Sequence, residues 1–282
     1  MSDQGTALSG LAADVPYVAL PPAGRRDSDE PAPLIVAWHL NDPPRSAAAM
    51  AAALPLAGVA AWRVYLDLPM HGRRQLPGGL DEFMQLGYKD AVLKAFEPQV
   101  TQAVAEFPAV LAELRARLPL TDGPIGLVGA SIGTLPAQLV IAEGAAQVSA
   151  AVLISPVIQL AEVVAANERR FNVSYAWSDA SRAVVGRLDF VARAPEIAAR
   201  DPQPALLLIT GAEDDPAFPL QAERLQSELS QRYSDPERLR RVSVPGMKHA
   251  LAAEPGIEPA PQTTEAQLVD AATTEWLRRY LT

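Results

Sequence analysis

The sequence predicts an α/β fold in which helices cover both faces of a mostly parallel β-sheet. Two observations carry this prediction. Short and almost wholly apolar runs alternate along the chain with longer segments whose apolar residues recur at helical spacing. The apolar runs also lack the alternation of apolar and polar residues that marks a half-exposed strand. This indicates strands buried on both faces, as they are in parallel sheets.

Six apolar runs are predicted to be strands. The first, PLIVAWH, has a single polar residue, the histidine at its end. The last run is more polar than the others, so we expect it to lie nearer an edge of the sheet. The predicted strands are 33–39, 59–68, 125–130, 150–155, 205–210 and 239–244.

Helices are predicted between these strands. In the longest of them, Pro98 and Pro108 are expected to break or kink the helix, because proline lacks the N–H that an interior helical position donates. Residues 1–14 are small and polar, and we expect them to form an irregular end. The predicted helices are 45–54, 80–118, 135–142, 220–233 and 264–281.

The chain is expected to form one domain, 1–282, with one insertion. Residues 156–203 separate two predicted strands and contain the aromatic residues Phe171, Trp177 and Phe190. We interpret this stretch as a small helical cap over the carboxyl edge of the sheet. The alternative is an ordinary crossover helix with a long surface loop.

The clearest functional signal is the segment Gly129-Ala130-Ser131-Ile132-Gly133 at the end of a predicted strand. G-x-S-x-G is the pattern of a nucleophile elbow, a sharp strand-to-helix turn that exposes a serine hydroxyl. The positions two before and two after the serine must be small, because the strand and helix backbones nearly touch there. The following helix directs the positive end of its dipole at the serine. The pattern therefore predicts that Ser131 is a nucleophile.

A serine nucleophile needs a general base and an acid that orients it. His249 is the best placed of the three histidines, because it lies between the last predicted strand and the last predicted helix. Glu213, Asp214 and Asp215 directly follow another predicted strand, so a carboxylate there faces the same edge of the sheet as the serine. From its spacing after Gly211 we favour Asp214 as the acid over Asp215, and Glu213 least.

The two other histidines are expected to have structural roles. His39 ends a buried strand, and His71 lies in a turn that contains glycine. The three histidines lack the i, i+4 spacing of a helical metal pair, and the chain has no H-E-x-x-H motif. We therefore predict no metal site and no cofactor.

The strand, elbow, acid loop and histidine loop together resemble the α/β-hydrolase superfamily, over roughly residues 30–282. The segment AWHLN at 37–41 is similar to the superfamily's H-G-x turn, and LPMHGR at 68–73 is similar to the P-x-H-G-x-R turn of its esterase and dienelactone-hydrolase-like branch. The resemblance implies that the backbone N–H groups of Ile132 and Asn41 form the oxyanion hole. Leu40 stands where the superfamily usually has glycine, and its own N–H is the reserve candidate.

The resemblance implies a serine hydrolase that cleaves a small or medium carboxylic ester through a Ser-His-Asp acyl-enzyme mechanism. Hydrolysis of amide, thioester or C–C bonds is an alternative, as is a non-catalytic protein that binds a ligand on the same scaffold. Aromatic and apolar residues are candidates to line an acyl pocket, although each suits a plain core as well. They are Trp38, Leu40, Met84, Phe171, Trp177 and Phe218.

The composition of the chain narrows the classes of molecule that the protein is expected to bind. The 33 acidic and 24 basic residues give a net charge of −9, which repels nucleic acid. There is no cysteine, which excludes disulfides and thiolate chemistry. No apolar run reaches the roughly 18 residues that a membrane span needs, so we expect a cytoplasmic protein that acts on a small molecule. The sequence leaves the oligomeric state open.

Overall fold

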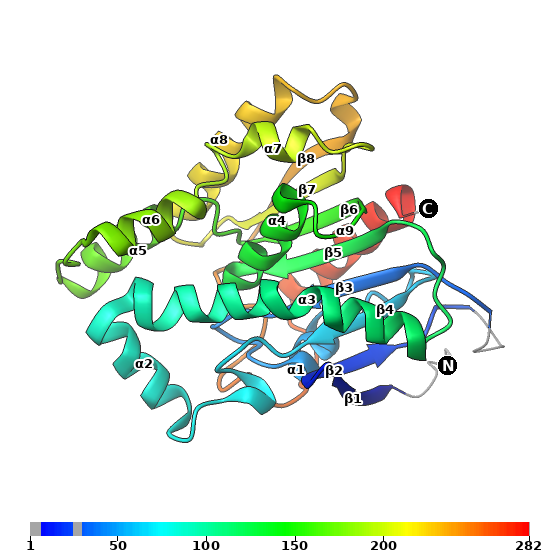
Figure 1. Ribbon diagram of the computed structural model, residues 1–282, viewed down its shortest axis with the longest axis horizontal. Coiled ribbons are helices and arrows are strands. Elements are labelled where there is room, and N and C mark those ends of the chain that lie inside the picture. Colours follow the sequence, from blue (N-terminus) through cyan, green and yellow to red (C-terminus); the bar gives the residue numbers. More distant parts are fainter. Residues whose placement is uncertain (1–6, 25–29, 282) are drawn as a thin grey trace.

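The computed structural model describes residues 7–24 and 30–281, which form a sheet of eight strands in the order β1-β2-β4-β3-β5-β6-β7-β8 (Figure 1). Strands β3 to β8 are all mutually parallel, whereas β1 and β2 pair antiparallel. The predicted mostly parallel α/β sheet is confirmed. The strands are β1 (Leu8–Ala12), β2 (Val15–Leu20), β3 (Leu34–Trp38), β4 (Trp62–Leu66), β5 (Ile125–Ala130), β6 (Val148–Ile154), β7 (Ala205–Gly211) and β8 (Leu239–Val244).

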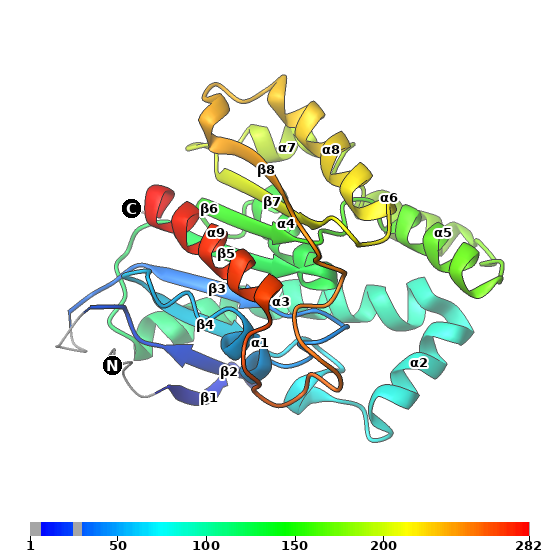
Figure 2. The same cartoon turned by 180° about the vertical axis from the view of Figure 1, so that it is seen from behind.

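Helices cover both faces of the sheet. Alternate residues of one strand enter different cores, because successive side chains of a strand point to opposite faces. In β5, Leu127 packs in the core beneath α3, α4 and α8, while Val128 packs in the core beneath α1 and α9 on the other face (Figure 2). The helices are α1 (Ala47–Ala53), α2 (Gly79–Asp90), α3 (Glu97–Arg117), α4 (Thr134–Glu143), α5 (Leu160–Phe171), α6 (Asp179–Arg187), α7 (Ala194–Ala198), α8 (Ala217–Ser230) and α9 (Thr264–Tyr280).

Residues 1–14 were expected to be irregular, and this expectation is wrong for the described part, residues 7–14. Residues 1–6 of that segment lie outside the described residues, but β1 and β2 form a hairpin. Ala13 and Asp14 join the two strands with φ values of 46° and 63°, and positive φ at both turn residues suits the twist of a hairpin. Every second residue of β2 faces the core, including Tyr17 and Ala19, and this burial holds the hairpin on the sheet.

The long helix predicted at 80–118 is interrupted before either proline. At Asp90 the backbone is extended, and its carboxylate accepts a hydrogen bond from Leu93 N–H, which caps a π-helical segment (Ala91–Phe96) that continues into α3. Pro98 stands in the first turn of α3, where N–H groups need no helical acceptor. Pro108 lies inside α3 on its exposed side, where water can reach the carbonyl that loses its donor.

Residues 156–203 contain α5, α6 and α7. Helices α5 and α6 project beyond the carboxyl edge of the sheet, on the same side as α2 (Figure 1). Tyr175, between α5 and α6, donates a hydrogen bond of 2.5 Å to the Asp90 carboxylate at the end of α2. That this stretch is an inserted cap remains a prediction.

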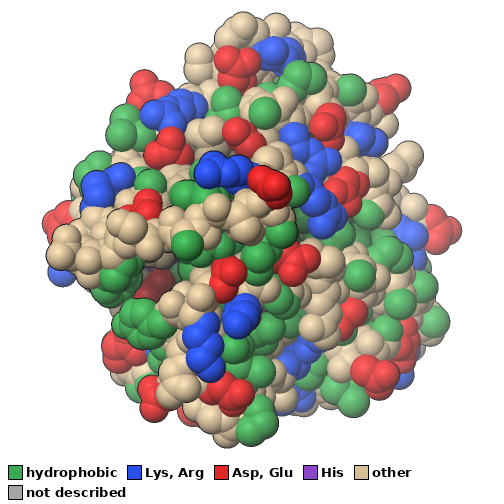
Figure 3. Space-filling view, turned by 60° about the vertical axis from the view of Figure 1, so that its left-hand side comes forward, with side chains coloured by type: hydrophobic (Ala, Val, Ile, Leu, Met, Phe, Trp, Pro, Cys, Tyr) green, Lys and Arg blue, Asp and Glu red, His purple; other side chains and the backbone are tan. Residues whose placement is uncertain are grey.

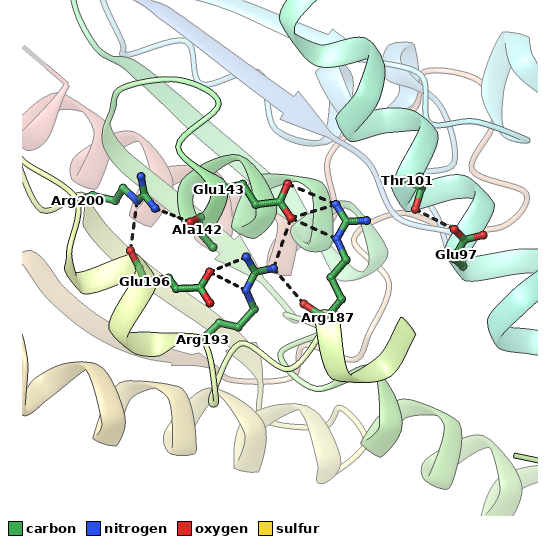
Figure 4. A network of polar contacts seen from close by, with 8 residues as sticks. All are labelled: Glu97, Thr101, Ala142, Glu143, Arg187, Arg193, Glu196 and Arg200. Carbon is green, nitrogen blue, oxygen red and sulfur yellow. Dashed lines mark hydrogen bonds and ion pairs between the residues drawn. The ribbon is translucent and has the colours of Figure 1, made fainter. Parts of the chain in front are cut away.

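Ion pairs attach α6 and α7 to the end of α4 (Figure 4). The Glu143 carboxylate of α4 pairs with Arg187 at 3.0 Å and with Arg193 at 3.6 Å. Arg193 also pairs with Glu196 of α7 at 2.6 Å. Arg200 donates to the carbonyl of Ala142. These contacts are partly exposed, so we expect each to contribute about 1 kcal/mol or less.

Candidate active site

Strand β5 ends in a tight turn that places Ser131 at the carboxyl edge of the sheet. Ser131 has φ of 48°, a left-handed conformation that costs a non-glycine residue on the order of 1–3 kcal/mol. A Cβ on Gly129 would lie 2.5 Å from the Gly133 carbonyl oxygen. A Cβ on Gly133 would lie 2.5 Å from the carbonyl oxygen of His39. Both glycines of the motif are therefore required by close backbone contacts, as an elbow demands.

The structure brings His249 to Ser131 although 118 residues separate them. The Oγ of Ser131 and the Nε2 of His249 are 2.7 Å apart, a short hydrogen bond. The loop that carries His249 is held to the end of β7 by backbone hydrogen bonds, including Glu213 N–H to the Met247 carbonyl at 2.9 Å. A Cβ at Gly211 would lie 2.2 Å from the same carbonyl oxygen, so only glycine allows the two loops to meet this closely.

Asp214, and not its neighbour, approaches the other side of the imidazole. Its two carboxylate oxygens lie 3.0 and 3.1 Å from His249 Nδ1, and its side chain is only 2% exposed. The Asp215 carboxylate instead accepts a hydrogen bond from Ala217 N–H at the start of α8. Because Nδ1 donates to Asp214, the neutral imidazole presents Nε2 as an acceptor to the Ser131 hydroxyl.

Two further residues border His249. The ring of Phe218, on α8, lies with its centroid 4.3 Å from that of the imidazole. The Asp42 carboxylate lies 3.9 Å from Nε2, in the turn that follows β3. Thus His249 has a buried carboxylate on its Nδ1 side and a half-exposed one on its Nε2 side.

The turn after β3 lies beside the elbow, as the contact between Gly133 and His39 shows. A buried side chain of α3 holds this turn. The side-chain amides of Gln99 and Asn41 hydrogen-bond each other in both directions, at 3.1 and 2.9 Å. Gln99 also donates to the Pro69 carbonyl at 3.1 Å. Gln99 thereby fixes the Asn41 side chain, and an oxyanion hole formed by the N–H groups of Asn41 and Ile132 remains a prediction.

The rings of His39 and His71 are buried and hydrogen-bonded to groups other than Ser131. His39 donates from Nδ1 to the Leu40 carbonyl, and its Nε2 accepts from Leu68 N–H at 3.1 Å. His71 Nδ1 lies 3.1 Å from the side-chain amide nitrogen of Gln99. Burial lowers the pKa of His39 to about 4 and that of His71 to about 3, so both rings are neutral at pH 7. These contacts agree with the structural roles expected for them.

The P-x-H-G-x-R turn is built around the buried carboxylate of Asp67. One oxygen accepts from Ala47 N–H at 2.7 Å, at the start of α1, and the other accepts from Arg73 N–H at 3.2 Å. A Cβ on Gly72 would lie 2.1 Å from the first oxygen, and Gly72 also has φ of 57°. The motif therefore anchors the loop after β4 to the start of α1.

The six residues predicted to line a pocket are dispersed. Phe218 contacts the candidate site, whereas Trp38 packs on Phe107 in the core, with ring centroids 5.5 Å apart. Leu40 is fully buried, and Trp177 stacks edge-on against Tyr175. Met84 and Phe171 are more than 40% exposed on projecting elements. The sequence analysis did not predict that Gln99 and Asp42 belong to the candidate site. No sequence pattern marks Gln99, and the only indication for Asp42 was its position next to Asn41.

The described ranges, 7–24 and 30–281, contain neither a metal-binding cluster nor a membrane-spanning helix. They contain no group of three or more acidic or histidine side chains that could hold a metal ion. Nor do they contain a helix with the length and apolar character needed to cross a bilayer.

Comparisons with known proteins find similarity in structure only. No protein-family model matches the chain, and no curated protein matches it significantly in sequence. TT1662 from Thermus thermophilus has a TM-score of 0.65 at 20% identity, over 97% of this chain and 99% of that protein. Carboxyl esterase 2 from the mycorrhizal fungus Tuber melanosporum has a TM-score of 0.62 at 15% identity, over 100% of this chain and 90% of the esterase. The acylaminoacyl peptidase of Pyrococcus horikoshii has a TM-score of 0.61 at 13% identity, over 98% of this chain but 41% of the peptidase.

At these identities the similarity establishes the fold. The predicted α/β-hydrolase fold is confirmed by the sheet order and by these neighbours. What the site does must be argued from its own geometry.

Proposed function

We propose that this protein is a serine hydrolase that cleaves small or medium carboxylic esters. Ser131 is the nucleophile, His249 the general base, and Asp214 the acid that orients the imidazole. The observation that carries the proposal is the continuous chain of contacts from Ser131 Oγ to His249 Nε2 at 2.7 Å and from Nδ1 to the Asp214 carboxylate at 3.0 Å. This is the geometry that an activated nucleophile requires.

In the acylation step, Ser131 Oγ forms a bond to the ester carbonyl carbon as its proton passes to His249 Nε2. The carbonyl oxygen becomes an oxyanion, which accepts hydrogen bonds from the N–H groups of Ile132 and Asn41. When the intermediate collapses, the bond to the alcohol oxygen breaks and the proton on Nε2 passes to that oxygen. Water then attacks the acyl-enzyme by the same sequence and releases the acid.

The surroundings of His249 support its role as base. Asp214 holds the Nδ1–H tautomer and stabilises the imidazolium that forms during each step. Its carboxylate is buried, so its attraction to the imidazolium is weakly screened by solvent. Each oxyanion donor contributes about 3–4 kcal/mol in comparable sites. Gln99 supports the second donor indirectly, because it fixes the Asn41 side chain from α3.

The fold neighbours support acyl transfer as the reaction class. They include a carboxyl esterase and an acylaminoacyl peptidase, so the scaffold accommodates both ester and amide substrates. An ester is the simpler proposal for this chain, because an ester carbonyl is attacked more readily than an amide carbonyl and an alcohol is a better leaving group than an amine. Amide and thioester substrates are tested alongside it.

A fluorophosphonate probe tests the nucleophile. We expect the wild type to be labelled covalently and to hydrolyse p-nitrophenyl esters, and Ser131→Ala to lose both properties while keeping its circular dichroism spectrum. Ser155→Ala is the matched control, because Ser155 is also buried at a strand end with positive φ, of 41°, but lies outside the proposed triad. It should be labelled like the wild type. An unlabelled wild type would favour the ligand-binding alternative.

A panel of esters with graded acyl chains, with matched amides and thioesters, tests the substrate class. We expect the highest kcat/KM for short or medium acyl esters. A higher kcat/KM for the matched amide or thioester would assign the same residues to that class of bond instead.

A further inference from the structure

The Asp42 carboxylate borders the position where the leaving group must lie. During acylation, His249 Nε2 gives its proton to the alcohol oxygen, so that oxygen lies within about 3.2 Å of Nε2. Asp42 lies 3.9 Å from the same nitrogen, and its side chain is 54% exposed. It is therefore within reach of a substrate bound at Ser131.

The charge of Asp42 can act on the bound substrate, whereas the charge of Asp214 acts on the imidazole. The Asp214 carboxylate is 2% exposed and is engaged by Nδ1 of His249. Asp42 stands on the Nε2 side, next in sequence to the Asn41 N–H that is proposed to bind the oxyanion. A second negative charge there opposes the oxyanion when the substrate is neutral. A positive charge on the substrate would remove this repulsion and add an attraction.

We propose that Asp42 selects substrates that carry a cationic group on the leaving alcohol, such as esters of amino alcohols. This inference rests on the proposed function, because it assumes that His249 protonates the leaving group. The acyl side of the substrate is not involved.

The distances around His249 Nε2 fit a substrate in which a short spacer separates the alcohol oxygen from the cationic nitrogen. With the alcohol oxygen within about 3.2 Å of Nε2, and Asp42 3.9 Å from Nε2, the two oxygens lie at most about 7 Å apart. A nitrogen two carbons beyond the alcohol oxygen lies about 3–4 Å from it, which leaves about 3–4 Å to the carboxylate. An ammonium at that spacing can pair with Asp42.

The surroundings indicate that the effect is local. On the face where α2, α5 and α6 project, acidic and basic side chains are interspersed, without a wide patch of one sign (Figure 3). A general acidic field on this face is therefore not expected to attract a cation. Within the described ranges, no lysine or arginine forms an ion pair with Asp42, whose contact with a charged-residue partner is the one with His249 at 3.9 Å.

The test compares two esters of equal shape, butyrylcholine and its uncharged analogue 3,3-dimethylbutyl butyrate. We expect the wild type to favour the cationic ester about tenfold in kcat/KM at low ionic strength, and this ratio to fall toward one as salt is added, since Asp42 is exposed. In Asp42→Asn the ratio should be near one at any salt concentration. Glu213→Gln is the control, because it removes an exposed carboxylate at the same edge of the sheet, and it should keep the wild-type ratio.

The possible failures are distinguishable. A wild-type ratio near one, with both esters hydrolysed, would overturn the role of Asp42 and leave the proposed function intact. So would an equal loss of the ratio in Asp42→Asn and Glu213→Gln, which would assign the preference to the general field. If neither ester is hydrolysed and Ser131 is not labelled, the proposed function fails and this inference fails with it.

Discussion

His39 and His71 are buried as neutral rings, so the protein should lose stability between pH 7 and pH 5. Burial lowers the pKa of His39 to about 4 and is also the main reason that the pKa of His71 falls to about 3. The unfolded chain binds a proton at each histidine below pH of about 6.5, whereas the folded rings stay neutral down to these lower values. The stability they contribute is therefore present above pH 6.5 and is lost as the pH falls toward 4 and 3.

The expected loss is a large share of the total free energy of unfolding. At pH 5, about 1.5 units below the unfolded-state pKa, each ring costs ~2 kcal/mol, at about 1.36 kcal/mol per unit. The two ring centroids are 6.0 Å apart, and neither ring is charged in the folded state at this pH. Their effects should nearly add, to ~4 kcal/mol, out of the roughly 5–15 kcal/mol that is typical of a folded domain.

Urea unfolding followed by tryptophan fluorescence at pH 7 and pH 5 measures this loss. His39→Gln and His71→Gln should each be less stable than the wild type at pH 7, because each removes buried hydrogen bonds. Each should nevertheless lose about half of the pH dependence, and the double variant most of it. A wild type that is equally stable at both pH values would refute the reasoning, as would a double variant that keeps the full pH dependence.

Three further predictions concern the site. Asp214→Asn should lower kcat for ester hydrolysis by several orders of magnitude through the wrong imidazole tautomer, while Asp215→Asn should change it little; the reverse ranking would move the orienting role to Asp215. Gly133→Ala should destabilise the fold by about 2 kcal/mol or more, because its Cβ meets a backbone oxygen at 2.5 Å, and an unchanged melting temperature would contradict this contact. Gln99→Leu should lower kcat about tenfold with a smaller change in KM, because the oxyanion turn loses its support. Gln102→Leu, on the exposed side of α3, should leave kcat unchanged, and equal losses in the two variants would show that Gln99 has no specific role.

The sequence predicted the six strands of the parallel sheet because their burial leaves a local trace. A strand covered on both faces has no solvent side, so β3 and β7 contain continuous apolar runs that differ from any amphipathic helix in the chain. The elbow could be recognised for a related reason. Gly129 and Gly133 are required by contacts within a few residues of Ser131 and with the adjacent strand, so the motif carries its own geometry.

The sequence could not predict elements that depend on distant partners. In the β1–β2 hairpin, β1 is short and mostly exposed, and the hairpin is held on the sheet by pairing with β4. The break at Asp90 depends on a side-chain cap rather than on the prolines that punctuate the sequence. Gln99 reads as an ordinary residue of α3, and only its contact with Asn41, 58 positions away, gives it a place beside the site.

The sequence by itself determined the fold class, the candidate nucleophile and the candidate base, because apolar runs, the G-x-S-x-G spacing and the number and positions of the three histidines are properties of the chain alone. Only the tertiary structure decided which acid meets the imidazole. Asp214 and Asp215 are adjacent and chemically identical, and both follow β7. The packing of Gly211 against the Met247 carbonyl sets the direction of that loop, so that Asp214 points to His249 and Asp215 to the start of α8. The position of Asp42 beside Nε2 was decided in the same way, by two loops that meet across more than two hundred residues of chain.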